Sequence, residues 1–194
     1  ALLYPRVGGL NSSDCRTSLP DDIITNATSR DIALPGNGVT FVLITLDNCF
    51  DHTKPNTLGP ATLAGLSVVL DTVRARADAR EIVGVGVTGK PFIFAVGADL
   101  TGVPKVTQRE QALAIGRLGH NTFEQLRELP VPTFAFVNGA AMGGGVEIAL
   151  SATYRSISSG VPALALPECF IGLVPGWGGC FMLPNLIGVK SALK

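Results

Sequence analysis

The sequence has few charged residues and no long apolar run, and each shortage excludes a class of protein. Charged residues make up 15% of the 194 positions, and fifteen basic residues balance fifteen acidic ones without a long block of either sign. Such a chain lacks the basic surface that binds nucleic acid or an anionic membrane. Apolar runs such as FVLITL (41–46) fall far short of the roughly 18 residues that span a bilayer. We therefore expect neither a nucleic-acid nor a membrane partner.

Cysteine is also sparse, which argues against a disulfide scaffold. The four cysteines, at positions 15, 49, 169 and 180, form no C-x-x-C pair and show no metal-ligand spacing. The start, ALLYPRVGGL, lacks the charged and long apolar regions of a secretory signal. We therefore expect four reduced thiols, a cytoplasmic chain and no metal.

The apolar content that is present follows the pattern of an α/β protein. Residues 1–38 are rich in turn-forming residues and predict an irregular N-terminal extension with at most a strand or two, and the organised domain is expected over 39–194. Apolar spacing predicts long helices over 57–77 and 107–129. Strand character alternates with these helices, which indicates parallel strands joined by right-handed crossovers. The predicted strands cover 39–46, 81–89, 133–137, 153–158 and 163–166.

The stretch GVGVTGKP (84–91) imitates two nucleotide-binding loops and satisfies the requirements of neither. A Walker loop needs Ser or Thr after its lysine to bind Mg²⁺ and a helix that starts there to hold phosphate. Position 91 is proline, and the β-like run FIFAV follows. The dinucleotide-binding motif fails for the same reason, because its third glycine should open a helix. We interpret residues 81–88 as a strand whose glycines permit close packing.

Two acidic residues in apolar surroundings are the candidates for chemistry. Glu147 lies at the start of an apolar helix in NGAAMGGGVEIAL, and Glu168 lies in ALALPECFIGL. A buried carboxylate must be hydrogen-bonded or functional, so each is either a structural acid or a catalytic one. A helix that starts near Gly144 would present free N–H groups to an anionic oxygen, although a plain glycine turn is the alternative.

Three segments together resemble the crotonase, or enoyl-CoA hydratase/isomerase, superfamily. They are FAVGADL (94–100), VNGAAMGGGVEIAL (137–150) and LALPECFIGLVPGWGG (164–179), in the family's order, and LDNCFDHTKPNTLG (46–59) is similar to its early loop. The resemblance covers about residues 39–194 and implies a core of repeated ββα units wound into a spiral. The family's further C-terminal helices have no counterpart before the final LIGVKSALK. The N-terminal extension and the segments DNCFDHTKPNTLGP and GKPFIFAVGADL are most similar in sequence to the hydratase portion of a multifunctional fatty-acid oxidation α chain.

The resemblance also implies a role for individual residues. Backbone N–H groups of Ala98 and Gly144 would form an oxyanion hole, Glu147 and Glu168 would be the two catalytic acids, and Gly176 would lie near the catalytic water. Having both acids favours a hydratase, since isomerases of the family usually keep only the second. The segment expected to bind CoA consists of Ala95, Val96, Ala98, Asp99, Leu100 and Thr101.

The implied function is the addition of water to a trans-2-enoyl-CoA in fatty-acid β-oxidation. The alternatives are an isomerase or another CoA-thioester enzyme of the same fold, or a truncated subunit without activity. The resemblance implies an acyl-CoA substrate, no further cofactor, and a homo-oligomer (trimer or hexamer) or an assembly with other β-oxidation enzymes. Other candidates are interpreted structurally: His120 as a surface or packing residue and Cys169 as a core thiol. Trp177 could line the acyl pocket or pack beneath a turn.

Overall fold

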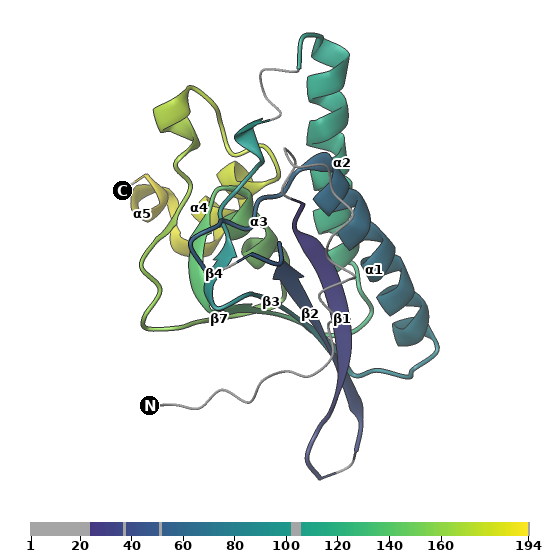
Figure 1. Cartoon of the computed structure of the whole chain (residues 1–194). Helices are drawn as coiled ribbons and strands as arrows, with labels where there is room; N and C mark the ends of the chain where they lie inside the picture. The colour runs from purple at the N-terminus through teal and green to yellow at the C-terminus, as the bar shows by residue number, and fades with distance from the viewer. Residues whose placement is uncertain (1–23, 37, 51, 102–105, 194) are drawn as a thin grey trace.

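The computed structural model describes residues 24–36, 38–50, 52–101 and 106–193, and these form an α/β structure (Figure 1). The strands are β1 (Asn26–Ala33), β2 (Thr40–Asp47), β3 (Gly84–Gly89), β4 (Phe92–Ala95), β5 (Thr133–Val137), β6 (Gly139–Met142), β7 (Tyr154–Ile157) and β8 (Leu164–Ala165). The helices are α1 (Pro60–Asp78), α2 (Arg109–Arg127), α3 (Gly144–Ser151), the short 3₁₀ helix η2 (Glu168–Ile171), α4 (Gly179–Ile187) and α5 (Val189–Ala192).

The larger sheet has the strand order β1-β2-β3-β5-β7 within the described residues. Only the β1–β2 pair is antiparallel, and the other strands run parallel as the alternation of strands and helices predicted. On β2, Val42, Ile44 and Leu46 are fully buried on one face, while their neighbours along the strand are half-buried on the other. This period of two places one apolar face of the strand in the core.

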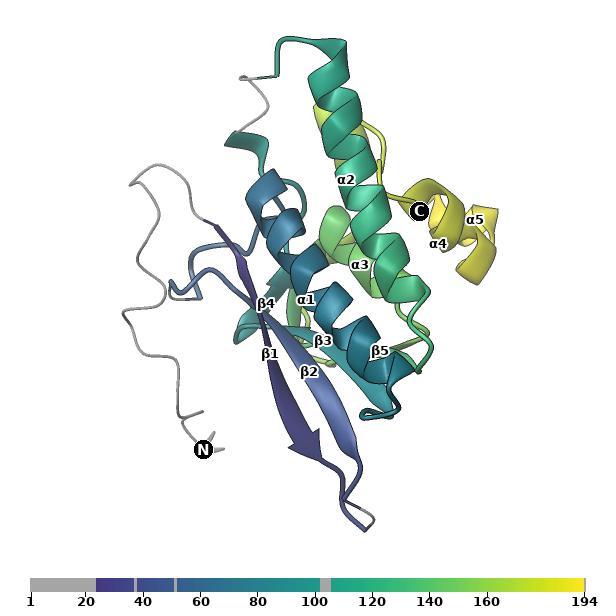
Figure 2. The same ribbon diagram turned by 90° about the vertical axis from the view of Figure 1, so that its right-hand side faces the viewer.

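Helices α1 and α2 lie side by side, and α1 packs against β1 of the larger sheet (Figure 2). Helix α1 begins at Pro60, a residue suited to the first turn because it has no N–H to leave unpaired. Its buried face repeats at three- and four-residue steps through Leu63, Leu66, Leu70 and Val73. Burying each such side chain contributes about 1.5–3 kcal/mol relative to leaving it exposed. The helix therefore holds its place through packing, as its sequence pattern predicted.

The smaller sheet has the order β4-β6-β8, and all of its strands are parallel. Asn138 connects the turn before β4 with the turn before β6. Its Nδ2 donates to the carbonyl oxygens of Gly89 and Lys90, both at 2.9 Å, and its Oδ1 accepts from the Gly89 N–H at 3.1 Å. The two turns are thus held together, and the first residues of β4 and β6 lie side by side.

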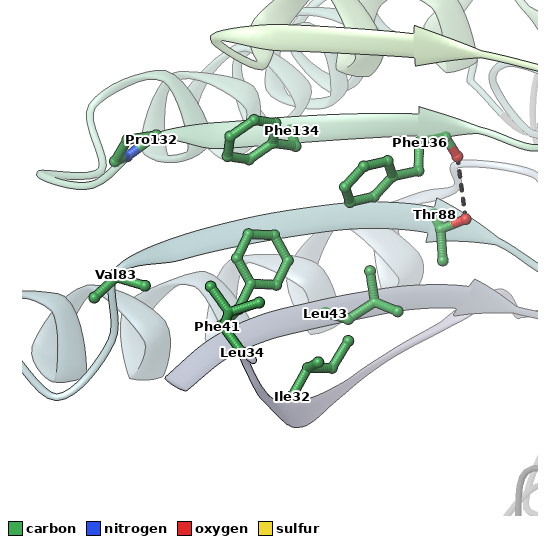
Figure 3. Close-up of a pocket in the computed structure, with 9 residues that line it drawn as sticks. All are labelled: Ile32, Leu34, Phe41, Leu43, Val83, Thr88, Pro132, Phe134 and Phe136. Atoms are coloured by element: carbon green, nitrogen blue, oxygen red, sulfur yellow. Dashed lines mark hydrogen bonds between the residues drawn. The ribbon is translucent and has the colours of Figure 1, made fainter. Parts of the chain in front are cut away.

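The face of the larger sheet away from α1 and α2 is lined with apolar and aromatic side chains (Figure 3). A groove of about 610 Å³ lies over it, bordered among others by Phe41, Leu43, Phe134 and Phe136. The ring of Phe136 lies so close to β3 that a Cβ on Gly86 would be 2.6 Å from its Cε2. The expected close packing at the glycines of GVGVTGKP is therefore confirmed, and the stretch is a strand followed by a turn.

Among the described residues of the N-terminal part, the structure shows one strand, within the strand or two allowed there, and it corrects two expectations about the cysteines. Strand β1 pairs with β2 along its whole length, so the sheet includes residues 26–33 of the predicted extension. The domain boundary at residue 38 itself stays a prediction. Cys49 is disulfide-bonded, so the expectation of four reduced thiols is wrong. Cys169 and Cys180 are free thiols, and Cys169 is exposed rather than a core residue. Cys15 lies outside the described residues.

None of the described helices combines the length and the apolar character that crossing a bilayer requires.

Candidate active site

The candidate residues gather where the three strands of the smaller sheet end. Register pairs place Ala95 of β4 beside Ala141 of β6, and Met142 of β6 beside Ala165 of β8. The carboxyl ends of neighbouring parallel strands lie at the same edge of a sheet. The segments that follow these ends carry Ala98, Gly144 and Glu168 respectively, so residues far apart in sequence meet at one edge.

Two backbone N–H groups lie free at this edge. Gly97 has φ +93° and Gly143 has φ +52°, both in the left-handed region that glycine adopts without strain. The two turns are close, because a Cβ on Gly97 would lie 3.8 Å from the Gly144 nitrogen. Within the described part of the chain, neither the Ala98 nor the Gly144 N–H donates a hydrogen bond. This pair can therefore bind an anionic oxygen.

Glu147 is 1% exposed and is held by backbone donors. Its Oε1 accepts hydrogen bonds from the N–H groups of Trp177 and Gly179, both at 2.8 Å. Burial raises the pKa of this carboxyl above its usual value, and the two backbone donors offset part of that effect. The negative charge of Glu168 raises the pKa further, whereas His120 lowers it. Glu147 is thus a fixed carboxylate that binds a proton more readily than an exposed glutamate.

Glu168 is half-buried at the start of η2 and lies against the backbone of the glycine turn. A Cβ on Gly143 would lie 2.5 Å from Glu168 Oε1, so only glycine leaves room for the carboxylate there. The other oxygen, Oε2, is buried and has no hydrogen-bond partner among the described residues. Burying a polar atom without a hydrogen-bond partner costs free energy. Such an atom in a folded protein is often explained by a bound ligand or water or by a catalytic role.

Trp177 packs in the core beside the site and is only 6% exposed. Its ring meets Phe123 edge to face, with centroids 5.5 Å apart. A Cβ on Gly144 would lie 2.4 Å from its Cζ3, and a Cβ on Gly119 would lie 2.2 Å from its Nε1. The indole therefore lies between α2 and the start of α3. Of the two interpretations left open by the sequence, the structure supports packing.

The remaining predicted residues differ in their surroundings. Gly176 is exposed and directly precedes the N–H that binds Glu147. Ala95 is fully buried, and its carbonyl lies against Gly145, so its side chain belongs to the core. The following residues turn outward: Ala98, Leu100 and Thr101 are exposed, while Val96 and Asp99 are half-buried. Asp99 Oδ1 accepts from the Thr101 N–H at 3.0 Å and from its hydroxyl at 2.6 Å.

Sequence reasoning did not identify the backbone donors of Glu147 or the glycine contact of Trp177. Both depend on chain segments that are about 30 and 58 residues apart, respectively, and no local pattern reports such contacts. His120 is exposed on α2, as predicted for a surface residue, yet it contributes to lowering the pKa of Glu147.

The family model for enoyl-CoA hydratase/isomerase matches residues 37–194, and the chain belongs to this family. The chain is 40% identical over 141 residues to the fatty acid oxidation complex subunit alpha of Pseudomonas syringae pv. tomato. It is 32% identical over 163 residues to the subunit of the same name from Shewanella frigidimarina. These matches cover 72% and 84% of this chain, but only 19% and 22% of those relatives.

Solved structures show the same fold. An enoyl-CoA hydratase from Bacillus anthracis superimposes with a TM-score of 0.72 at 30% identity, covering 86% of this chain and 60% of that one. DspI from Pseudomonas aeruginosa superimposes with a TM-score of 0.71 at 29% identity, covering 91% and 66%. The predicted crotonase-like α/β fold is confirmed, and the chain spans about three fifths to two thirds of these proteins.

Proposed function

We propose that the chain catalyses the hydration of a trans-2-enoyl-CoA. One observation carries the proposal: the backbone N–H groups of Ala98 and Gly144, which donate no hydrogen bond within the described residues, lie at the same sheet edge as the carboxylates of Glu147 and Glu168. Acyl thioester chemistry needs such donors, because negative charge develops on the thioester oxygen when a nucleophile adds to the conjugated double bond. Hydration also needs a group that accepts a proton and one that provides one.

The proposed reaction divides these tasks between the carboxylates. Glu147 accepts a proton from water, and the water oxygen forms a bond to C3 of the enoyl group. The electron pair of the C2–C3 double bond shifts towards the thioester oxygen, where the Ala98 and Gly144 amides stabilise it. Protonated Glu168 then gives its proton to C2. Net addition of one water molecule leaves the pair of acids with the same number of protons.

Three features of the site support these roles. The Trp177 and Gly179 N–H groups occupy Oε1 of Glu147, while Oε2 accepts no hydrogen bond from the described residues and is left for water. The raised pKa of Glu147 makes its carboxylate a stronger base once ionised. Oε2 of Glu168 is buried and has no hydrogen-bond partner among the described residues, which leaves this oxygen available to the substrate.

For the rest of the substrate, we infer that the exposed turn from Ala98 to Thr101 contacts the CoA portion. The reaction as written needs no metal or further cofactor. The names of the relatives suggest a role in fatty-acid oxidation as the hydratase part of a larger α subunit. An acyl-CoA is then the substrate, and a homo-oligomer or an assembly with other β-oxidation enzymes is the expected setting.

The direct test is hydration of crotonyl-CoA, followed by loss of the absorbance of the conjugated thioester. We expect Glu147→Gln and Glu168→Gln each to lower kcat by about 100- to 10,000-fold, the usual contribution of a general acid or base. Glu124→Gln is the matched control, because this exposed carboxylate on α2 lies outside the proposed site, and it should leave the rate unchanged.

Two outcomes would contradict the proposal. If both glutamine variants keep the wild-type rate, the mechanism with two glutamates is wrong. If the folded wild type moves the double bond of an enoyl-CoA but forms no 3-hydroxyacyl product, the chain is an isomerase.

A further inference from the structure

Three buried polar side chains lie beside the segment that carries Ala98, and the proposed mechanism gives them no role. Asn48, Asn56 and Lys90 are each at most 3% exposed. Burying such groups costs free energy unless they are hydrogen-bonded. Their partners therefore show which parts of the chain they hold in place.

Asn56 is the centre of this group and is fully buried. Its Nδ2 donates to the carbonyl oxygen of Leu46 on β2 at 2.8 Å and to that of Phe94 on β4 at 3.2 Å. Its Oδ1 accepts from the Asn48 N–H at 3.2 Å. One side chain thus connects strands that belong to different sheets.

The backbone around Asn56 continues this connection to the turn before Ala98. The Val96 N–H donates to the Asn56 carbonyl oxygen at 2.9 Å, and the Leu58 N–H donates to the Gly97 carbonyl oxygen at 2.8 Å. Strand β4 ends at Ala95, so these two bonds, rather than the sheet, hold the chain as it approaches Ala98.

Lys90 supports the same loop from its other side. Its Nζ donates to Asn48 Oδ1 at 2.5 Å and to the Phe50 carbonyl oxygen at 3.1 Å. Asn48 Nδ2 donates in turn to the Pro55 carbonyl oxygen at 2.5 Å, next to Asn56. The lysine of GVGVTGKP, Lys90, therefore holds the loop that contains Asn56.

We propose that Asn56 is a positioning residue for the Ala98 N–H, and that Lys90 supports it through Asn48. The inference rests on the proposed function in so far as the Ala98 amide binds a thioester oxygen. Gly144 is held separately, at the end of β6 and the start of α3. Loss of the Asn56 side chain therefore displaces one of the two donors and leaves the other in place.

The effect on catalysis follows from the geometry of the pair. A displacement of about 1 Å at a catalytic group can cost about 100-fold in rate. Since the donor acts mainly when charge develops on the oxygen, the loss should fall on kcat rather than on KM. For Asn56→Ala we expect kcat to fall about 10- to 100-fold, with KM changed by less than about threefold.

The experiment combines hydration of crotonyl-CoA with amide NMR of the free protein. In Asn56→Ala the ¹H–¹⁵N resonance of Ala98 should move, while that of Gly144 should stay near its wild-type position. Thr133→Val is the matched control. Thr133 is also buried, it lies at the start of β5, away from the proposed site, and its hydroxyl forms hydrogen bonds with Thr153. It should lower stability without moving the Ala98 resonance or kcat.

The outcomes separate this inference from the proposed function. An unmoved Ala98 resonance in Asn56→Ala overturns the inference, whether or not the chain hydrates crotonyl-CoA, and so does a moved resonance with an unchanged kcat. A moved resonance in a chain whose wild type does not hydrate crotonyl-CoA keeps the positional role of Asn56 and overturns the proposed function. If Asn56→Ala does not fold, Lys90→Met takes its place, with a smaller shift of the Ala98 resonance expected and an unmoved resonance again decisive against the inference.

Discussion

At the scale of single residues, the acidity of Glu147 depends on its burial. The same carboxyl on the surface would titrate near pH 4.3. In the structure, burial raises its pKa, while the Trp177 and Gly179 N–H groups hold its Oε1. As a proposed base, it is active only when ionised.

The first prediction concerns the pH dependence of the reaction. As the pH falls through the raised pKa of Glu147, the base becomes protonated and kcat/KM falls. The acidic limb should therefore lie above the pH expected for an ordinary glutamate. A pH profile of kcat/KM with crotonyl-CoA measures it, and a limb at or below about pH 4.3 would contradict the assignment of Glu147 as the base.

The same shift also predicts how stability depends on pH. Because the folded state favours the neutral acid, this stabilising contribution is complete below the ordinary pKa of glutamate. It is lost as the pH rises through the raised pKa of Glu147. In Glu147→Gln the amide oxygen can still accept both N–H groups but does not titrate. Urea unfolding at a series of pH values should therefore show that the free energy of unfolding of Glu147→Gln rises relative to that of the wild type as the pH increases through this range.

At the scale of elements, helix α2 contributes a glycine contact to the site. Gly119 faces Trp177, and a Cβ there would lie 2.2 Å from Nε1 of the indole. Gly116, one turn earlier on the same helix, has nothing within 4 Å of the corresponding position. The two glycines differ in what surrounds them, although both are helical.

Gly119→Ala should therefore be destabilising and should lower kcat, because it displaces Trp177 and with it the N–H that holds Glu147. Gly116→Ala is the control and should stabilise the protein by about 0.5–1 kcal/mol, since alanine is the better helix former. Thermal unfolding and crotonyl-CoA hydration measure both effects. Equal behaviour of the two variants would show that the contact between Gly119 and Trp177 has no consequence for the site.

The elements also show what the sequence could predict. Apolar periodicity predicted helices over 57–77 and 107–129, and the structure has them at 60–78 and 109–127. Such periods reflect burial of one face and are local. The pairing of β1 with β2, the bond at Cys49 and the place of Trp177 depend on contacts distant in sequence, which no local pattern contains. Glu147, Glu168 and Gly144 were singled out from their sequence surroundings, whereas the other site residues and all of the roles came from resemblance, and the roles stay proposals.

At the scale of the whole molecule, the two sheets and helices α1, α2 and α3 share one hydrophobic core. The buried cluster extends from Val42 and Leu63 to Phe94, Ala141 and Trp177. A continuous core favours unfolding in a single cooperative transition. Trp177 is the only tryptophan of the sequence, so its fluorescence reports on the part of the core beside the site.

We therefore expect tryptophan fluorescence and far-ultraviolet circular dichroism to give coincident transitions in urea. A fluorescence change at lower denaturant than the loss of helix would show instead that the region of the site opens by itself. The expected homo-oligomer stays a prediction at this scale, and sedimentation velocity measures it.

The arrangement at the carboxyl ends of β4 and β6 affects which functions of the proposed site amino-acid substitutions can remove during evolution. The two proposed oxygen-binding donors, the N–H groups of Ala98 and Gly144, are main-chain groups, and each lies in the segment that follows the end of a strand. A point substitution can delete Glu147 or Glu168, but almost no substitution at Ala98 deletes its amide. Amino-acid substitutions accumulated in evolution should therefore change the proposed proton transfers at C2 and C3 of the substrate first. The proposed binding of the thioester oxygen by backbone N–H groups should be lost much later.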